Sequence, residues 1–172
     1  MSVRKATLND IPRIAEIYDI LTSDEETCRF TNWLKGVYPT KDFAMKALED
    51  GDLYVGEDEN GIFGSMLLNS VQLPEYKDIN WIYSAEPHEV LVIHTLCIDT
   101  AFRGKGKAKE LIEYAEKYGI DNNKKVIRLD TYEGNIPACT MYPKLGYLYS
   151  GTAFFNFMGK IPENLKCFEK LL

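Results

Sequence analysis

The sequence predicts an α/β fold in which helices flank a mixed β-sheet. Its main evidence is a strand–helix–strand unit: an apolar run at Val90–Ile98, a helical pattern from Gly104 to Tyr118, and a second apolar run at Val126–Asp130. Such a crossover makes the two strands parallel. Val90–Ile98 is apolar at both alternating positions, which is typical of a central strand covered on both faces. At 172 residues we expect one domain spanning residues 1–172.

The elements before this unit also alternate between strand and helix. Either Asn9 or Asp10 is suited to cap the first helix, and Pro12 would lie in its first turn. Residues 23–40 show a mixed pattern of acids and aromatic residues. Residues 71–89 form a long irregular stretch, and loops of that length in compact domains are often functional. The expected elements are a strand at Val3–Ala6, helices at Ile11–Leu21 and Lys41–Glu49, and a hairpin of Leu53–Gly56 with Ile62–Leu68.

The C-terminal part is predicted to return to helix and strand after the second apolar run. We expect Gly119 to end the long helix. A further helix is expected to begin at Asn135 as its cap, with Pro137 near its start, and to end at Gly146. The remaining expected elements are strands at Tyr147–Tyr149 and Phe154–Met158 and a terminal helix at Glu163–Leu172.

The composition is typical of a globular protein, and the net charge of the chain makes some classes of binding partner unfavourable. The formal net charge is -6, whereas general binding to nucleic acid needs a positive field. No apolar run approaches the ~20 residues that span a bilayer. We therefore expect neither a nucleic-acid partner nor a membrane partner.

The cysteines and the N-terminus bear on metals and on compartment. The four cysteines show no C-x-x-C spacing, and the chain has two histidines, so we expect no metal site. Residues 1–5 carry no apolar segment of the kind found in secretion signals. We expect a cytoplasmic protein with reduced thiols.

The segment Arg103-Gly104-Lys105-Gly106-Lys107-Ala108 joins the central strand to the long helix. A glycine turn before a helix leaves backbone N–H groups pointing into open space, and the positive end of the helix dipole adds to their attraction for anions. The sequence therefore predicts a cofactor that bears phosphate.

The spacing within this loop separates three known phosphate-binding patterns. A P-loop needs four residues between its first Gly and a Gly-Lys-Ser/Thr ending, which this chain lacks. A dinucleotide fingerprint needs a third Gly or Ala where Lys109 stands. The third pattern, Gln/Arg-x-x-Gly-x-Gly/Ala, is filled by Arg103, Gly106 and Ala108.

Three motifs, one of which contains this loop, occur in order along the chain. The motifs are Val3–Pro12 at the start of the chain, Leu96–Asp99 followed by Phe102–Gly106, and Asn135 and Ala138 followed by Tyr142–Tyr147. On these residues the chain resembles the GNAT superfamily of N-acetyltransferases, and the resemblance covers nearly all of it.

The resemblance implies an acyl-CoA N-acyltransferase (GNAT) fold with a mixed central sheet of six or seven strands flanked by helices. The parallel strands Val90–Ile98 and Val126–Asp130 are expected to splay apart and admit the cofactor arm. The implied reaction is direct transfer of acetyl from acetyl-CoA (coenzyme A) to a primary amine within a ternary complex, without a metal. The acceptor would be a small-molecule or peptide amine.

The same resemblance implies the residues that would hold the cofactor. Backbone N–H groups from Lys105 to Ala108 would bind the pyrophosphate, and Gly104 and Gly106 would allow close approach. Arg103, Lys105 and Lys107 would add positive charge. The backbone of Leu96, Cys97 and Ile98 would pair with the pantetheine arm.

Tyr142 and Asn135 each have two interpretations. Tyr142 lies on an apolar helical face and would suit the core, but the family motif places there an acid that protonates the departing thiolate. Asn135 would either cap its helix or also bond the cofactor arm.

His94 and Cys97 also have competing interpretations. By strand alternation His94 shares a face with Val92, Leu96 and Ile98. It would be a core histidine or the general base, and a water chain ending at a carboxylate is the competitor for that role. Cys97 would be core or pocket lining rather than a nucleophile, because no His/Asp set supports a covalent route.

Several functional alternatives stay open at this level. The same fold and loop would suit a non-catalytic acyl-CoA-binding sensor or regulatory module, whereas an enzyme that uses nucleoside triphosphate is disfavoured by the missing Ser/Thr. The acids Asp24, Glu25 and Glu26 lie where related proteins build the acceptor pocket. The oligomeric state is also open, with a homodimer among the alternatives.

Overall fold

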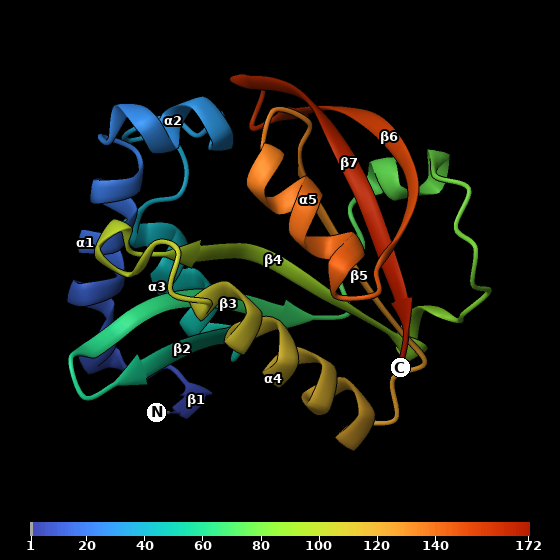
Figure 1. The fold of residues 1–172 in the computed structure, drawn as a ribbon, viewed down its shortest axis with the longest axis horizontal. Helices are drawn as coiled ribbons and strands as arrows, with labels where there is room; N and C mark the ends of the chain where they lie inside the picture. Colours follow the sequence, from blue (N-terminus) through green and yellow to red (C-terminus); the bar gives the residue numbers. More distant parts are fainter. Residues whose placement is uncertain (1) are drawn as a thin grey trace.

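In the computed structural model, residues 2–172 form a seven-stranded sheet flanked by helices (Figure 1). The strands follow the order β1-β2-β3-β4-β5-β7-β6. They are β1 (Ser2–Lys5), β2 (Leu53–Asp58), β3 (Gly61–Asn69), β4 (Val90–Ile98), β5 (Val126–Tyr132), β6 (Leu148–Phe157) and β7 (Ile161–Leu171). Neighbouring strands are antiparallel except β4 and β5, which are parallel. The mixed sheet with a central strand–helix–strand unit is therefore confirmed.

Helices cover both faces of this sheet. They are α1 (Ile11–Leu21), α2 (Glu25–Thr31), α3 (Lys41–Glu49), α4 (Lys107–Asp121) and α5 (Ile136–Lys144). On one face, α4 and α5 bury apolar side chains such as Leu111 and Ile112 against the sheet. On the other face, α1 and α3 do the same with Ile14, Ile17 and Ala44. The helical periods of α1 and α3 thus mark the residues that are shielded from water.

The irregular segment 71–89 packs on the same face as α1 and α3. Its Tyr76 and Ile79 join a cluster with Val90 and Val92 of β4. Antiparallel pairing places Leu67 opposite His94 and Asn69 opposite Val92, and Leu67 belongs to the cluster beneath α1 and α3. This face therefore carries α1 and α3 over one half of the sheet and the segment 71–89 over the other.

A buried ion pair ties the segment 71–89 to the sheet. Arg128 of β5 and Glu169 of β7 are 5 % and 0 % exposed, and their side chains approach to 3.4 Å. Arg128 also donates to the side chain of Gln72 at 2.6 Å and to the carbonyl of Tyr83 at 3.1 Å. Its guanidinium lies 4.1 Å from the ring centre of Trp81. Because each guanidinium nitrogen of Arg128 meets an acceptor, the buried charge is stabilised and the segment 71–89 is held against the sheet.

Strand alternation along β4 breaks at Thr95, which changes where His94 lies. Thr95 has a left-handed backbone (φ 49°), and the register with β3 shifts between Ser65 and Leu67. Such a bulge adds one residue and reverses the faces beyond it. Leu96 and Ile98 consequently pack with the cluster beneath α4. The predicted shared face of His94 with Leu96 and Ile98 is therefore wrong.

The prediction that Gly119 ends the long helix is wrong. Helix α4 continues to Asp121. A Cβ atom added to Gly119 would lie 2.4 Å from the side chain of Leu172 and 3.3 Å from that of Leu91. The missing side chain lets α4 approach the sheet closely, so Gly119 serves packing rather than termination.

The C-terminal elements also differ from the prediction. Residues Ile161–Leu171 form strand β7 instead of a terminal helix, and the two expected short strands are one strand, β6, with a bulge between Tyr149 and Gly151. β7 lies between β5 and β6, and its pairing with strands distant in the chain overrides the local pattern.

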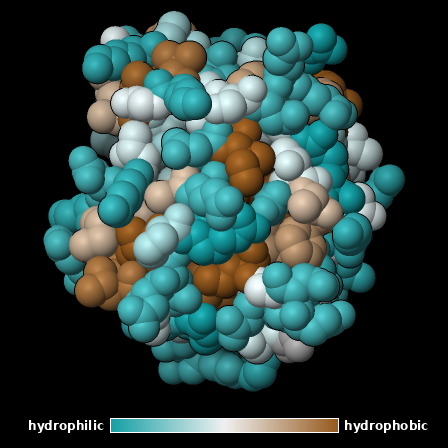
Figure 2. All heavy atoms as spheres, turned by 90° about the vertical axis from the view of Figure 1, so that its left-hand side faces the viewer, coloured by the Kyte–Doolittle hydropathy of each residue, from teal (hydrophilic) through white to brown (hydrophobic). Residues whose placement is uncertain are grey.

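The face that contains α1 and α2 is mainly polar. Figure 2, turned so that the left side of Figure 1 faces the viewer, shows hydrophobic residues divided by hydrophilic ones. Within residues 2–172 we find no helix long and apolar enough to cross a bilayer.

Candidate functional site

The two parallel strands separate midway along their length. β4 and β5 pair from Val90 with Val126 to Ile93 with Leu129. Beyond that point β4 remains paired with β3 as far as Ile98, and β5 remains paired with β7 as far as Tyr132. The facing backbone groups beyond Ile93 and Leu129 are therefore left without partners across the gap, and the predicted splay is confirmed.

The glycine loop opens directly onto the start of α4. Gly104 and Gly106 have φ angles of 74° and 77°, and a Cβ atom at either position would meet nothing within 4 Å. Gly106 is the N-cap, and the first intrahelical bond joins the amide of Glu110 to its carbonyl at 3.3 Å. The N–H groups of Ala108 and Lys109 thus lack an intrahelical acceptor and point out of the helix. This end of α4 can bind an anion.

The basic side chains of the loop are engaged by acids. Lys107 Nζ lies 2.9 Å from Asp58 and 3.4 Å from Glu110, and 4.6 Å from the ring centre of Phe63. These contacts fix the start of α4 against the β2–β3 hairpin. The contribution of the Lys107 charge to cofactor binding stays a prediction.

Arg103 makes its contacts with α2. Its guanidinium donates to Glu26 at 2.6 Å and to Asp24 at 3.1 Å, and it also contacts the hydroxyl of Thr27. Asp24 and Glu26, which the sequence suggested for the acceptor pocket, thus bind the loop arginine. Lys105 lies 5.3 Å from the ring centre of Phe102.

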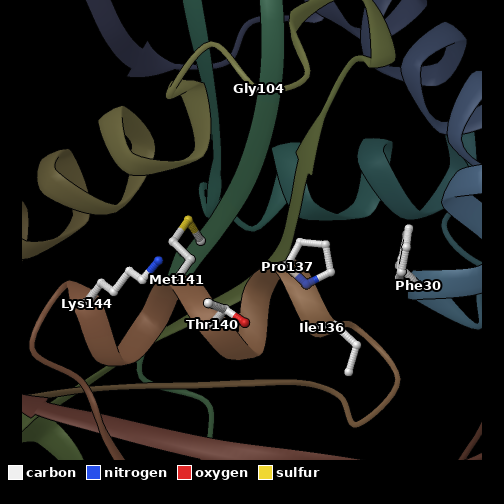
Figure 3. A pocket seen from close by; sticks show the side chains of 7 residues that line it. All are labelled: Phe30, Gly104, Ile136, Pro137, Thr140, Met141 and Lys144. Carbon is white, nitrogen blue, oxygen red and sulfur yellow. The ribbon is translucent and has the colours of Figure 1, made fainter.

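A pocket of about 920 Å³ lies beside the loop (Figure 3). It is lined by Phe30 of α2, Gly104 of the loop, and Ile136, Pro137, Thr140, Met141 and Lys144 of α5. Figure 3 shows Pro137 and Met141 on the side of α5 that faces the loop carrying Gly104. The pocket therefore connects the anion-binding helix end with α5, on the face of the sheet that carries α4.

The oxygen and the nitrogen of the Asn135 side-chain amide both form hydrogen bonds within the protein. Its oxygen accepts from the backbone of Ala138 at 3.2 Å, and its nitrogen donates to the hydroxyl of Thr131 at 3.1 Å. These bonds confirm the helix-cap interpretation. Contact with a cofactor stays a prediction.

Tyr142 sits in the core beneath α5 and is 5 % exposed. Its ring centre lies 5.8 Å from that of Tyr147 and 5.5 Å from that of Phe168. Its hydroxyl has no hydrogen-bond partner among residues 2–172. The hydroxyl oxygen is not completely buried. Burial and the nearby Asp130 raise the pKa of Tyr142, so the phenol is protonated at neutral pH.

Cys97 faces the opposite side of β4 from Leu96 and Ile98. It is 1 % exposed, and burial raises the pKa of its thiol above the usual value. A protonated thiol is a poor nucleophile. Its position in the cluster beneath α1 and α3 supports the core interpretation.

His94 is half-buried and leans toward β3. Its Nε2 lies 3.1 Å from Asn69 Oδ1 and 3.0 Å from the carbonyl of Val71. Both partners accept hydrogen bonds, so we assign the ring proton to Nε2. Burial lowers the pKa of His94. These partners lie on the side of β4 away from the splay, and the role of His94 as a base stays a prediction.

Tyr76 is one of the aromatic residues that the sequence suggested for the acceptor pocket, but neither Asp130 nor the contact between the two was predicted. Asp130 follows Leu129, the last residue of β5 that pairs with β4, and its Oδ2 accepts a 2.6 Å hydrogen bond from the hydroxyl of Tyr76. Burial raises the pKa of Asp130 to about 6. An acid at the end of an apolar parallel strand was the available signal, but Tyr76 lies in a segment without a period.

Clusters of possible metal ligands were also sought. Across the described part of the chain, residues 2–172, there is no group of three or more His, Cys, Asp or Glu side chains arranged to hold an ion.

Comparison with known proteins agrees with this geometry. The sequence profile of the Acetyltransferase (GNAT) family matches residues 14–147. Streptothricin acetyltransferase of Escherichia coli is 30% identical over 147 residues, which are 84% of this chain and 74% of that protein. A GNAT acetyltransferase structure from Streptococcus agalactiae superposes with a TM-score of 0.83 at 20% identity, covering 99% of this chain and 95% of that one.

A further structural relative shows the same fold. The ribosomal-protein-alanine N-acetyltransferase of Brucella melitensis superposes with a TM-score of 0.72 at 18% identity, covering 100% of both chains. The profile match spans most of the sequence and includes the splayed strands, the loop and α5. The chain belongs to the GNAT family of acetyltransferases.

Proposed function

We propose that this chain transfers acetyl from acetyl-CoA to a primary amine, directly and within a ternary complex. The observation that supports this most strongly is the open N-terminus of α4 beside the splayed ends of β4 and β5. The GNAT family implies acetyl-CoA as co-substrate. When bound, that group would supply the activated acetyl thioester.

The residues around the splay fit this co-substrate. The amides of Ala108 and Lys109 lack intrahelical acceptors, and no Cβ atom at Gly104 or Gly106 blocks the approach of a diphosphate. The unpaired edge of β4 beyond Ile93 offers backbone groups that an extended amide-containing arm can bond. The proposed pairing residues are Leu96, Cys97 and Ile98.

Tyr142 is proposed as the acid. As the acetyl carbon forms its bond to the amine nitrogen, the bond to sulfur breaks and the thiolate needs a proton. The Tyr142 hydroxyl supplies that proton and regains one from the amine side. Its raised pKa keeps the hydroxyl protonated at neutral pH, so the proton is present when the thiolate leaves.

For the acceptor we propose a small-molecule amine, with a peptide amine as the alternative. The support is the relationship to streptothricin acetyltransferase, which is 30% identical over most of this chain. Neither nucleic acid nor membrane is part of the proposal, in keeping with the net charge of -6.

The competing function is a non-catalytic acyl-CoA sensor. The burial of Tyr142 among aromatic rings favours it, because a tyrosine of this kind also serves as core. Such a module would bind acetyl-CoA but would not pass the acetyl group to any amine.

The test combines acetyl-CoA binding by calorimetry with release of free thiol in the presence of amines. Tyr142→Phe should lower thiol release by about 100-fold while the affinity for acetyl-CoA changes less than about 2-fold. Tyr147→Phe, which removes a neighbouring buried hydroxyl, is the matched control and should keep the native rate. Equal rates in Tyr142→Phe and the native chain would remove Tyr142 from the mechanism.

A further inference from the structure

A carboxylate stands at the point where β4 and β5 part. Asp130 is the first residue of β5 after the last parallel pair, Ile93 with Leu129. Its neighbour Leu129 belongs to the cluster beneath α4 and α5, so alternation directs Asp130 to the opposite face. Figure 1 shows the two strands diverging there. The α5 pocket thus lies on the face of the sheet that carries α4, and Asp130 lies on the opposite face.

The segment 71–89 holds this carboxylate in one orientation. The hydroxyl of Tyr76 donates to Asp130 Oδ2 at 2.6 Å. Tyr76 is 2 % exposed, and its ring centre lies 5.1 Å from that of Trp81. Trp81 in turn donates its indole N–H to the carbonyl of Tyr76 at 3.0 Å and stacks on Arg128. Tyr76 of the segment 71–89 therefore places a hydrogen-bond donor in a fixed position beside the splay.

One oxygen of Asp130 is left for a ligand. Within residues 2–172, the Oδ1 atom of Asp130 has no hydrogen-bond partner. This oxygen is not completely buried. The nearest cation along the strand, Arg128, is already paired with Glu169. A carboxylate with one open oxygen and no neutralising partner attracts a cation.

We propose, on the basis of the acetyltransferase function above, that Asp130 binds the ammonium group of the acceptor at the splay and takes its proton at Oδ1. Tyr76 acts as the positioning residue through Oδ2. The acceptor amine enters from the face that carries the segment 71–89, while the thioester lies on the side of α5.

The proton balance of this step is complete. An ammonium acceptor has three N–H bonds and the amide product has one, so two protons leave. Asp130 takes the first and passes it to water. The second follows as the C–N bond forms and the C–S bond breaks, and it replaces the proton that Tyr142 has given to the sulfur.

The chemistry of the carboxyl group suits this role better than that of an ordinary aspartate. Its pKa is raised from 3.8 to about 6, chiefly by burial, so it is a stronger base and is still ionised at neutral pH. His94 is the competing base, but its Nε2 is engaged by Asn69 and Val71 on the β3 side.

Several titratable and charged groups face Asp130 from the surrounding elements. They are Tyr76 and Glu75 of the segment 71–89, Tyr38 of the α2–α3 loop, Tyr142 of α5, Glu163 and Cys167 of β7, and Arg128 of β5. The Tyr76 hydrogen bond lowers the pKa of Asp130, and the charge of Glu75 raises it. Variants of these two residues should thus move its titration in opposite directions.

The experiment measures kcat/KM against pH by thiol release, with acetyl-CoA and whichever of putrescine, lysine, an aminoglycoside, streptothricin or an alanyl peptide reacts fastest. The native profile should fall below about pH 6, where Asp130 takes up its proton. Asp130→Asn, which still accepts from Tyr76, should lose about 100-fold or more with acetyl-CoA affinity unchanged by calorimetry.

Tyr76→Phe should lower kcat/KM on the alkaline plateau, because the carboxylate loses its positioning donor, and should shift the acidic limb to higher pH. Glu75→Gln should shift the acidic limb to lower pH. A merely structural role would not produce this opposed pair of shifts. Native kcat/KM in Asp130→Asn, or a limb that moves only in His94→Asn, would overturn the proposal. A native chain that binds acetyl-CoA but releases no thiol with any of these amines would overturn the proposed function itself, and this proposal with it.

Discussion

Burying Asp130 has a consequence for stability that can be measured apart from activity. Its pKa of about 6 lies above the value of 3.8 for an unfolded aspartate, so the folded state holds the proton more tightly. Stability is therefore lost as the pH rises from about 4 to about 6. Above that range the ionised carboxylate remains buried at a cost of up to about 3 kcal/mol.

Asp130→Asn should accordingly raise the stability of the protein at pH 8 and change it little at pH 4, because asparagine cannot ionise. Thermal unfolding of both proteins at the two pH values checks this. The same difference in Tm at pH 4 and pH 8 would show that burial does not penalise the charge.

A second prediction at the residue scale concerns the loop glycines. Gly106→Ala places a Cβ atom in the open space where a diphosphate would lie, on a left-handed backbone that costs about 1 kcal/mol for alanine. We expect acetyl-CoA affinity to fall by about 10-fold or more by calorimetry.

Gly159→Ala is the matched control for this change. Gly159 has φ 67° and nothing within 4 Å, and it lies in the β6–β7 turn. It should show the same loss of stability without loss of affinity. Equal affinity in the two variants would mean that the loop does not contact the co-substrate.

At the scale of elements, the contact between Arg103 and α2 brings a helix to the edge of the pocket. Phe30 of α2 lines that pocket, and Arg103 binds Asp24 and Glu26 near the start of the same helix. Exposed ion pairs of this type contribute about 1 kcal/mol or less to stability. Their main effect here is to hold α2 beside the loop.

Arg103→Ala should therefore weaken acetyl-CoA binding by about 3-fold to 10-fold with little change in Tm. Lys117→Ala removes the same charge from the exposed face of α4, where Lys117 pairs with Asp121, and should leave binding unchanged. The proposed role of the α2 contact fails if the two variants bind acetyl-CoA equally well in calorimetry.

Elements with strong local patterns were predictable from the sequence. α3 has the predicted bounds Lys41–Glu49, and β4 has the predicted bounds Val90–Ile98. β7 was not predictable in this way, because its apolar residues fit a helical period and its strand form depends on β5 and β6. The bulge at Thr95 is likewise set by pairing with β3 rather than by local sequence.

The site residues also differ in whether a local pattern in the sequence predicts them. The glycine loop and Asn135 could be located because each is marked by a local motif beside a helix start. The bond between Tyr76 and Asp130 joins residues 54 positions apart, and the bond between Arg103 and Glu26 spans 77 positions. Contacts of this range depend on how loops cross the sheet, which no motif in the chain encodes.

At the scale of the whole molecule, the two faces of the sheet carry different parts of the candidate site around the separated ends of β4 and β5. The face with α4 and α5 carries the pocket and the open helix end, and the face with the segment 71–89 carries Asp130. The pairing of β4 with β5 ends directly before Asp130. A ternary complex needs such an arrangement, since both substrates must reach the same point without displacing each other.

Transfer of acetyl to an amine can be measured as release of coenzyme A thiol from acetyl-CoA with and without amine. We predict that release by the native chain depends on an added primary amine, with one acetylated amine formed for each thiol. A chain that binds acetyl-CoA yet releases no thiol with any amine of the panel would contradict it.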